Sequence, residues 1–163
     1  MTFSIRTTTE HDWREIRDQR LEMLADTPLA FGEFLEDALK VDEAGWRLRG
    51  ARGHAVTSTY FAAITDDGRW VGIMGGVIEF GRPVLVGVYV SPGFRGPSGV
   101  ADALLTAVED WARLRQDTLV LHVHSLNPRA RAFYARRGFV ETGVTVPYRL
   151  DPSQTELEMV KKL

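Results

Sequence analysis

The chain has no cysteine among its 163 residues. This absence excludes disulfide bonds, thiolate metal sites and a cysteine nucleophile, and it fits a reducing compartment. No apolar run approaches the roughly 20 residues that span a bilayer. The first residues, Met1 to Arg6, lack the apolar stretch of a secretory signal peptide. We therefore expect a cytoplasmic protein with no membrane partner.

The chain also has no large excess of positive or of negative charge. The sequence has 20 Lys and Arg against 22 Asp and Glu, and a net charge of −2. This balance gives no reason to expect nucleic acid as a partner. The length suits one domain with one core, and no repeat or linker interrupts it, so we expect a single domain over residues 1–163.

Hydrophobic periodicity predicts seven strands and four helical regions, in the order of a mixed α/β sheet with helices on its faces. The almost wholly apolar segment Val84–Val90 is typical of a strand buried on both faces. The second helical region has a ragged pattern that also fits two short helices. The expected strands are Phe3–Thr8, Tyr60–Thr65, Trp70–Glu79, Val84–Val90, Leu119–Ser125, Phe139–Thr145 and Glu156–Lys161, and the expected helices are Glu10–Ala25, Phe34–Arg49, Gly99–Arg115 and Asn127–Gly138.

A glycine-containing loop, 91–99, connects the apolar strand to the cleanest helix. Such a loop presents unpaired backbone N–H groups and the positive end of the helix dipole, which together favour a phosphate. Arg95 adds a fixed positive charge with a bidentate fork. The loop is not a P-loop, because Val100-Ala101 and not a Lys-Ser/Thr pair follows its last glycine, and it lacks the glycine spacing of the dinucleotide fingerprint. From these residues alone, the loop is either a phosphate site or an ordinary strand-to-helix turn.

The loop, its strand and its helix resemble motif A of the GNAT N-acetyltransferases, in which an Arg/Gln-x-x-Gly-x-Gly/Ala loop lies under the pyrophosphate of CoA. A second segment, Leu119 to Gly143, resembles motif B of the same family: Asn127, a small residue three positions later, then Phe133-Tyr134 and Gly138-Phe139. Two motifs in this order are far more specific than either alone. The resemblance covers about Val71 to Gly143. It implies the GNAT acyl-CoA N-acyltransferase fold, an α/β fold with a central, mostly antiparallel sheet flanked by helices.

The resemblance implies acetyl-CoA as cofactor. One departure concerns the loop, Arg95-Gly96-Pro97-Ser98-Gly99, which is one residue longer than in the family, and Pro97 has no N–H. Ser98 can compensate with its hydroxyl or as an N-cap, and we expect the N–H groups of residues 99–101 to be the surest phosphate donors. The expected cofactor-binding residues are Val88, Tyr89, Val90, Arg95, Gly96, Ser98, Gly99, Val100, Ala101, Asn127, Arg129, Arg131 and Tyr134.

Gly87 lies inside the apolar strand, where glycine marks either a bulge with close backbone approach or a position that avoids a clash. The resemblance implies that this strand splays from its neighbour. Its free backbone at Val88 to Val90 would then pair with the pantetheine arm. One N–H group there would also hold the thioester oxygen as it becomes negative.

The resemblance implies that Tyr134 is the general acid that protonates the leaving thiolate; otherwise it is a core tyrosine. Glu79, at a strand end, is the candidate base. His122 and His124 alternate along one strand and could relay a proton, bind metal or simply pack. No third ligand completes a metal site, so we expect none. Asn127 is a helix cap, a pantetheine contact or both.

We therefore expect an N-acetyltransferase that moves an acetyl group onto a primary amine of a small molecule or a protein, by direct attack in a ternary complex. The alternative is a non-catalytic acyl-CoA-binding or regulatory module on the same fold. The family places acceptor specificity in regions that correspond here to Thr27–Phe34 and Val144–Ser153. Glu33, Glu36 and Asp37 would draw a cationic amine or are simply solvated. Family members are often dimeric, so a homodimer is expected.

Overall fold

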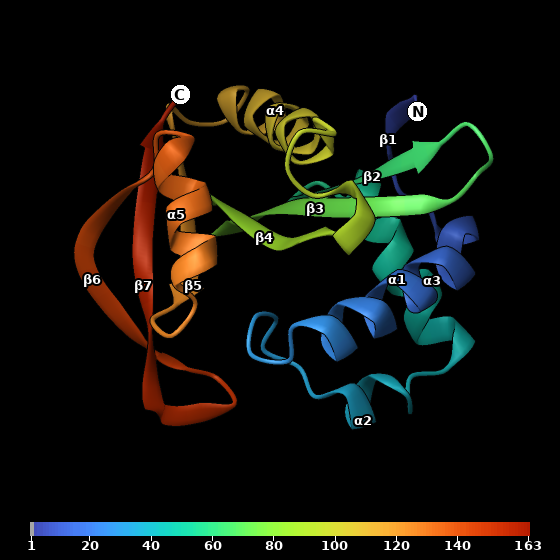
Figure 1. The fold of residues 1–163 in the computed structure, drawn as a ribbon, viewed down its shortest axis with the longest axis horizontal. Helices are drawn as coiled ribbons and strands as arrows, with labels where there is room; N and C mark the ends of the chain where they lie inside the picture. The colour runs from blue at the N-terminus through green and yellow to red at the C-terminus, as the bar shows by residue number, and fades with distance from the viewer. Residues whose placement is uncertain (1) are drawn as a thin grey trace.

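A seven-stranded mixed sheet runs through the computed structural model, which describes residues 2–163 (Figure 1). The strand order is β1-β2-β3-β4-β5-β7-β6, and all neighbouring pairs are antiparallel except β4 and β5, which are parallel. This arrangement confirms the mixed sheet expected from the sequence. The strands are β1 (Phe3–Thr7), β2 (Ser58–Thr65), β3 (Trp70–Glu79), β4 (Arg82–Val90), β5 (Thr118–His124), β6 (Val140–Tyr148) and β7 (Asp151–Lys162).

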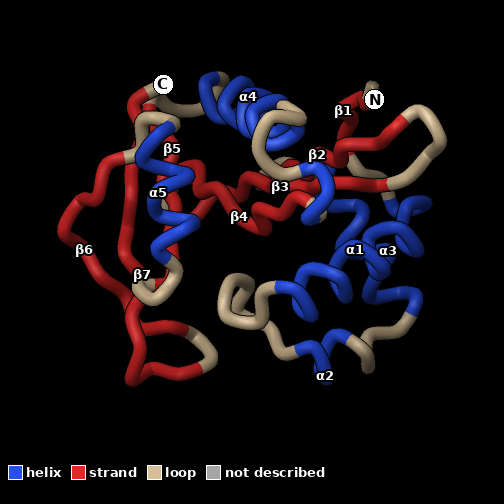
Figure 2. The backbone as a smooth tube through the Cα atoms, in the orientation of Figure 1, coloured by secondary structure: helices blue, strands red, loops and turns tan. Residues whose placement is uncertain are grey.

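Helices cover both faces of the sheet (Figure 2). One face packs against α4 and α5, whose apolar side chains share one buried cluster with residues of β3, β4 and β5. The other face of β3 and β4 packs against α1, where Met23 contacts Ile73 and Tyr89. In residues 2–163, none of the helices has the length and apolarity that crossing a membrane takes. The helices are α1 (Trp13–Asp26), α2 (Leu35–Ala38), α3 (Glu43–Ala51), α4 (Val100–Arg113) and α5 (Pro128–Arg136).

Strand β4 carries a bulge at the expected glycine. Ile73 and Gly75 of β3 are opposite Tyr89 and Val86, so β4 has one more residue than β3 between these pairs. Gly87 has a φ of 59°, in the left-handed region that glycine adopts without steric cost. A Cβ there would lie at an ordinary 3.6 Å from the Tyr60 ring. The bulge, and not an avoided clash, therefore explains this glycine.

Strands β4 and β5 pair at one position only, Val84 with Val120, and diverge beyond it. This divergence corrects one expectation. The sequence predicts a strand buried on both faces, but Val86 to Val88 are only half-buried. The missing neighbour at the β5 side leaves this part of β4 partly open, which composition alone does not reveal.

Several local predictions are confirmed with changed boundaries. The ragged region forms two separate helices, α2 and α3. Asn127 caps α5 through its side-chain oxygen, which accepts from the Ala130 N–H at 3.1 Å, and Pro128 occupies the first turn. Gly138 ends this helix with a φ of 93°. The last hairpin is longer than expected, because β6 and β7 together run from Val140 to Lys162 with irregular pairing between them.

Candidate functional site

The N-terminus of α4 lies directly after the expected phosphate loop. Gly99 is the N-cap in a left-handed conformation, with a φ of 79°, and its carbonyl accepts the first helical hydrogen bond from Ala103. The N–H of Val100 donates to the Ser98 hydroxyl at 3.3 Å, so one of the three expected donors already has a partner. The Gly99 and Ala101 N–H groups remain at the positive end of the helix dipole. This geometry suits a phosphate group.

Arg95 makes hydrogen bonds within the protein that the sequence did not predict. Its Nε donates to the Val90 carbonyl at 2.7 Å, and its Nη2 pairs with the Asp26 carboxylate at the end of α1. Although burial opposes it, the hydrogen bond from Arg95 holds the pKa of Asp26 below its ordinary value. The side chain therefore connects the loop to both α1 and β4, and its remaining donors are those available to an anion.

Beyond the bulge, the side of β4 that faces β5 has backbone groups without a strand partner. The Ser91 N–H donates to the Val71 carbonyl at 2.9 Å, so the backbone of Ser91 faces β3. Because successive residues of a strand alternate in this respect, the backbone of Val90 and of Val88 faces the β5 side, whereas that of Tyr89 faces β3. The structure thus offers two of the three expected residues for main-chain contacts at this edge.

The side chain of Tyr89 lies on the face of the sheet that packs against α1. Its hydroxyl donates to Glu22 Oε1 at 3.0 Å, and the Ser91 hydroxyl donates to the same oxygen at 2.7 Å. Burial and this hydrogen bond raise the pKa of Tyr89. The Glu22 carboxylate, which sequence analysis did not single out, therefore connects α1 to the end of β4.

Tyr134 is buried on the opposite face, where it belongs to the same cluster as Val90, Val100 and Ala101. Its ring lies edge-on to Phe133 and Phe139, with centroids 5.3 and 5.7 Å away. Burial alone raises the pKa of the Tyr134 hydroxyl, without a charged or hydrogen-bonded neighbour. The group therefore stays protonated at neutral pH, which is the state that an acid needs.

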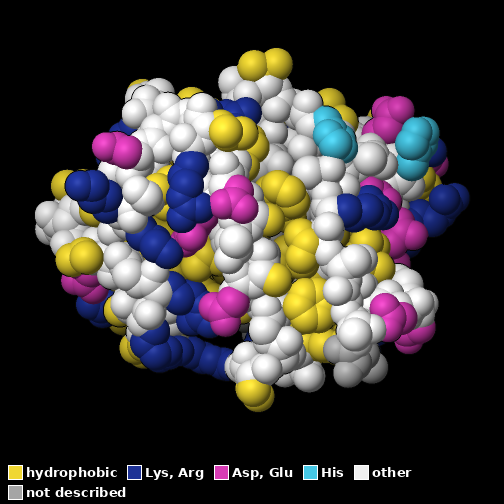
Figure 3. Space-filling model, turned by 90° about the horizontal axis from the view of Figure 1, so that it is seen from above, with side chains coloured by type: hydrophobic (Ala, Val, Ile, Leu, Met, Phe, Trp, Pro, Cys, Tyr) yellow, Lys and Arg dark blue, Asp and Glu magenta, His cyan; other side chains and the backbone are white. Residues whose placement is uncertain are grey.

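Helix α5 concentrates positive charge beside this site. Figure 3 shows Lys and Arg side chains gathered at the side of the molecule where α5 lies. Arg131 pairs with Glu141 at 2.6 Å, and Arg137 pairs with Asp102 in the first turn of α4 at 2.7 Å. Arg129 is exposed, and its charge helps to lower the pKa of Asp26. The start of α5, the end of α1 and the phosphate loop therefore lie close together.

The candidate base Glu79 and the two histidines make none of the contacts described above. Glu79 is exposed at the end of β3, opposite Arg82, and does not line the pocket described below. His122 Nε2 lies 3.4 Å from Glu158. His124 is buried, accepts the Leu126 N–H at 3.0 Å and contacts Gln154 at 2.7 Å. Within residues 2–163, no three His, Asp or Glu side chains come together as a metal-binding group.

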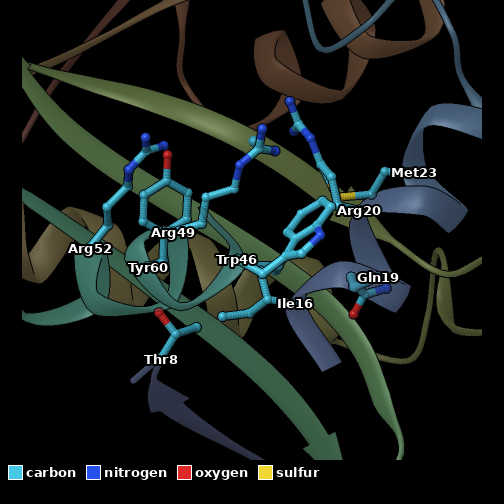
Figure 4. A pocket seen from close by; sticks show the side chains of 11 residues that line it. Thr8, Ile16, Gln19, Arg20, Met23, Trp46, Arg49, Arg52 and Tyr60 are labelled. Atoms are coloured by element: carbon cyan, nitrogen blue, oxygen red, sulfur yellow. The ribbon is translucent and has the colours of Figure 1, made fainter. Parts of the chain in front are cut away.

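A pocket of about 90 Å³ opens on the α1 face, directly at the bulge (Figure 4). Side chains of α1 and α3 line one side, and β2, β3 and Gly87 of β4 line the other. Three lining residues are arginines, Arg20, Arg49 and Arg52. In the view of Figure 4 their guanidinium groups extend to the same side as the Tyr60 hydroxyl. Sequence reasoning missed these arginines, because they come from separate elements and no local motif joins them.

The two regions expected to choose the acceptor lie next to each other. A Cβ on Gly32 would lie 4.0 Å from the side chain of Arg149. Glu33, expected to draw a cationic amine, instead pairs with Arg20 at 2.8 Å and with Arg49 at 2.7 Å. Its charge is therefore already neutralised by this chain. Glu36 and Asp37 are exposed, as the alternative of a solvated face predicts.

Comparison with known proteins agrees with this geometry. The family described as "Acetyltransferase (GNAT) family" matches residues 13–139. Curated protein sequences give no match.

Solved structures with the same fold include two that hold the cofactor. The PaiA N-acetyltransferase of Thermoplasma acidophilum, in complex with coenzyme A, has a TM-score of 0.78 and 19% identity, with 100% of each chain covered. YncA of Salmonella typhimurium, a putative acetyltransferase with acetyl-CoA, has a TM-score of 0.78 and 17% identity, over 100% of this chain and 95% of that one. Nourseothricin acetyltransferase is 28% identical over 66% of each chain, with a TM-score of 0.59. Since the family match covers most of its length, the chain belongs to the GNAT family of acetyltransferases, which are enzymes that use acetyl-CoA.

Proposed function

We propose that this enzyme transfers the acetyl group of acetyl-CoA to a primary amine of a small molecule or a peptide, with Tyr134 as general acid. The observation that carries the proposal is the divergence of β4 from β5 after one paired position, beside the α4 N-terminus. This divergence leaves the backbone of Val88 and the N–H of Val90 free for an extended ligand whose phosphates lie at the helix, while the Val90 carbonyl accepts from Arg95. The buried Tyr134 belongs to the cluster that lines the same region.

Backbone and side-chain donors at the phosphate loop and at α5 bind the pyrophosphate of acetyl-CoA in this proposal. The Gly99 and Ala101 N–H groups and the free donors of Arg95 face the pyrophosphate. The exposed guanidinium of Arg129 supplies a further positive charge beside the loop. Since Arg131 already pairs with Glu141, we assign it a secondary role in cofactor binding.

Catalysis requires one backbone donor and one acid. Bound acetyl-CoA supplies an activated acyl group, so that the amine nitrogen forms a C–N bond at the thioester carbon while the C–S bond breaks. The Val88 N–H at the bulge stabilises the carbonyl oxygen as it gains negative charge. The Tyr134 hydroxyl gives its proton to the departing sulfur, and the amine loses its own proton to water.

The test is release of CoA thiol from acetyl-CoA in the presence of amines, measured with a thiol reagent. The protein has no cysteine, so all thiol signal comes from CoA. The proposal requires release that depends on both enzyme and amine, with an acetylated amine detected by mass spectrometry. CoA binding by calorimetry without any acetylated product across a broad amine panel would indicate the non-catalytic module instead.

We further propose that residues 1–163 act as one domain. The sheet begins with β1 near the N-terminus and ends with the β6–β7 hairpin at the C-terminus, and its halves meet at β4 and β5, where we place the cofactor. Limited proteolysis should then yield no stable half-length fragment, and CoA should slow digestion of the whole chain.

A further inference from the structure

The pocket at the bulge is positively charged where it meets solvent. Its lining includes three arginines and no carboxylate. Glu33 is shared by Arg20 and Arg49, which donate to both of its oxygens. Two guanidinium charges therefore face one carboxylate, and the third arginine, Arg52, adds a further positive charge without an ion pair among residues 2–163.

Tyr60 connects these arginines to the bulge. A Cβ on Gly75 would lie 2.4 Å from the Tyr60 ring, so the ring packs directly on β3 at a position that only glycine permits. The same ring atom would lie 3.6 Å from a Cβ on Gly87. Figure 4 shows the Tyr60 hydroxyl directed to the side where the guanidinium groups of Arg49 and Arg52 lie. One side chain thus extends from the proposed reaction centre to the positive charges.

The buried lining of the pocket is mostly apolar, and its two polar side chains are Thr8, whose hydroxyl donates to the Gly50 carbonyl, and Gln19. Ile16, Met23 and Trp46 line it, and all three are buried. Gln19 also lines it and is only 3% exposed, yet neither its amide oxygen nor its amide nitrogen has a hydrogen-bond partner. A buried amide without partners is unfavourable unless a ligand or water satisfies it. A ligand or a water inside the pocket would therefore satisfy the Gln19 amide.

We propose that the acceptor amine carries an anionic group, a carboxylate or a phosphoryl group, that binds the guanidinium of Arg52, unpaired among residues 2–163, and the N–H groups of Arg49 that Glu33 leaves free, while the amine nitrogen lies at the bulge. The inference rests on the proposed transfer reaction and specifies its substrate class. Arginine is suited to both anions because its planar fork donates two parallel hydrogen bonds. A polycationic acceptor would meet the same guanidinium charges and be repelled.

Matched pairs of amines test the proposal by CoA release. Leucine is compared with leucinamide, and 2-aminoethylphosphonate with ethanolamine, while spermidine serves as the cationic member. We expect kcat/KM to be about ten- to a hundredfold higher for the anionic member of at least one pair. The preferred pair distinguishes a carboxylate from a phosphoryl group. Equal rates within both pairs, or a preference for spermidine, would overturn the proposal.

Variants locate the effect in the pocket. Arg52→Gln should raise KM for the anionic amine about tenfold or more with a nearly unchanged kcat, and should leave the neutral amine unaffected. Arg52→Glu should reverse the preference towards spermidine. Arg47→Gln is the matched control, because it removes a positive charge from α3 at a residue outside the pocket lining. A loss of anion preference in the Arg47 variant equal to that in the Arg52 variants would contradict the assignment.

Calorimetry separates this inference from the proposed reaction. The anionic amines are titrated into the protein saturated with CoA, which carries no acetyl group to transfer. Binding that Arg52→Gln weakens, in a protein that acetylates no amine, would refute the transfer reaction and retain the anion site. Transfer without selective anion binding would do the opposite, and absence of both would overturn both proposals.

Discussion

At the scale of single residues, Tyr134 offers the clearest separation of chemistry from binding. Its hydroxyl is protonated at neutral pH, and burial raises its pKa further above the ordinary value. Tyr134→Phe removes the acid and keeps the ring, so we expect kcat to fall about a hundredfold, as for loss of a general acid. Stopped assays of CoA release give kcat, and calorimetry gives the affinity for CoA. A parallel loss of CoA affinity would indicate that the hydroxyl binds the ligand instead.

Gly87 is the second informative residue. Gly87→Ala places a side chain at a φ of 59°, which costs about 1–2 kcal/mol of folding stability. Because the strain falls on the bulge, we also expect kcat to decrease. Gly81→Ala is the matched control: it has a φ of 77°, with open space around it, in the β3–β4 turn away from the pocket. Urea unfolding should show a similar loss of stability in both variants. Equal kcat values in both would mean that the bulge does not hold the thioester oxygen.

At the scale of elements, a negative charge added at the start of α4 tests whether this helix N-terminus binds the phosphates of CoA. Gly99 has a left-handed conformation and nothing within 4 Å of an added Cβ, so any side chain there has room but carries backbone strain. Gly99→Glu adds a negative charge at the phosphate position and should weaken CoA binding at least a hundredfold, or about 3 kcal/mol. Gly99→Ala carries the same strain without the charge. Calorimetry should therefore find a much smaller loss in the alanine variant, and equal losses would place the phosphates elsewhere.

The elements themselves follow closely from local patterns. Periodicity predicts α4 over Gly99–Arg115, and the structure has Val100–Arg113. The turn signals around Asn127 and Gly138 correctly bracket α5, because caps depend on residues that are near in sequence. The hydrogen-bond partner of the Val100 N–H could not be predicted in the same way. Its bond to Ser98 depends on the path of a loop that is one residue longer than the family pattern.

At the scale of the whole molecule, the sequence signal is weakest where distant segments meet. Val86 to Val88 have the composition of a fully buried strand, yet β5 diverges from them while it stays paired with β7 along its whole length, and this depends on segments distant in sequence. The three pocket arginines likewise come from α1, α3 and the turn after it. Arg49 and Arg52 are three positions apart in sequence, but only the folded chain brings Arg20 and the bulge beside them, so spacing alone could not predict the pocket.

Glu33 provides a test of that assembly, since it joins α1 and α3 through Arg20 and Arg49. Burial raises its pKa, but the hydrogen bonds from Arg49 and Arg20 outweigh burial and hold the pKa below its ordinary value. A carboxyl group with a lowered pKa stabilises the fold above the unfolded-state value near pH ~4.3, and this contribution is lost as pH falls through the folded-state pKa. Glu33→Gln should therefore cost about 1–3 kcal/mol at neutral pH, because its side chain is only 16% exposed and two guanidinium groups lose their partner.

The difference in stability between the wild-type protein and Glu33→Gln should be full above about pH 5 and shrink steadily below about pH 4. Urea unfolding across this range measures it, with Glu36→Gln, an exposed carboxyl group on α2, as the control that should show almost no difference. A Glu33→Gln deficit that persists at low pH would mean that the residue stabilises the fold by packing alone. Because the same substitution frees Arg20 and Arg49, it should also strengthen binding of anionic amines at neutral pH.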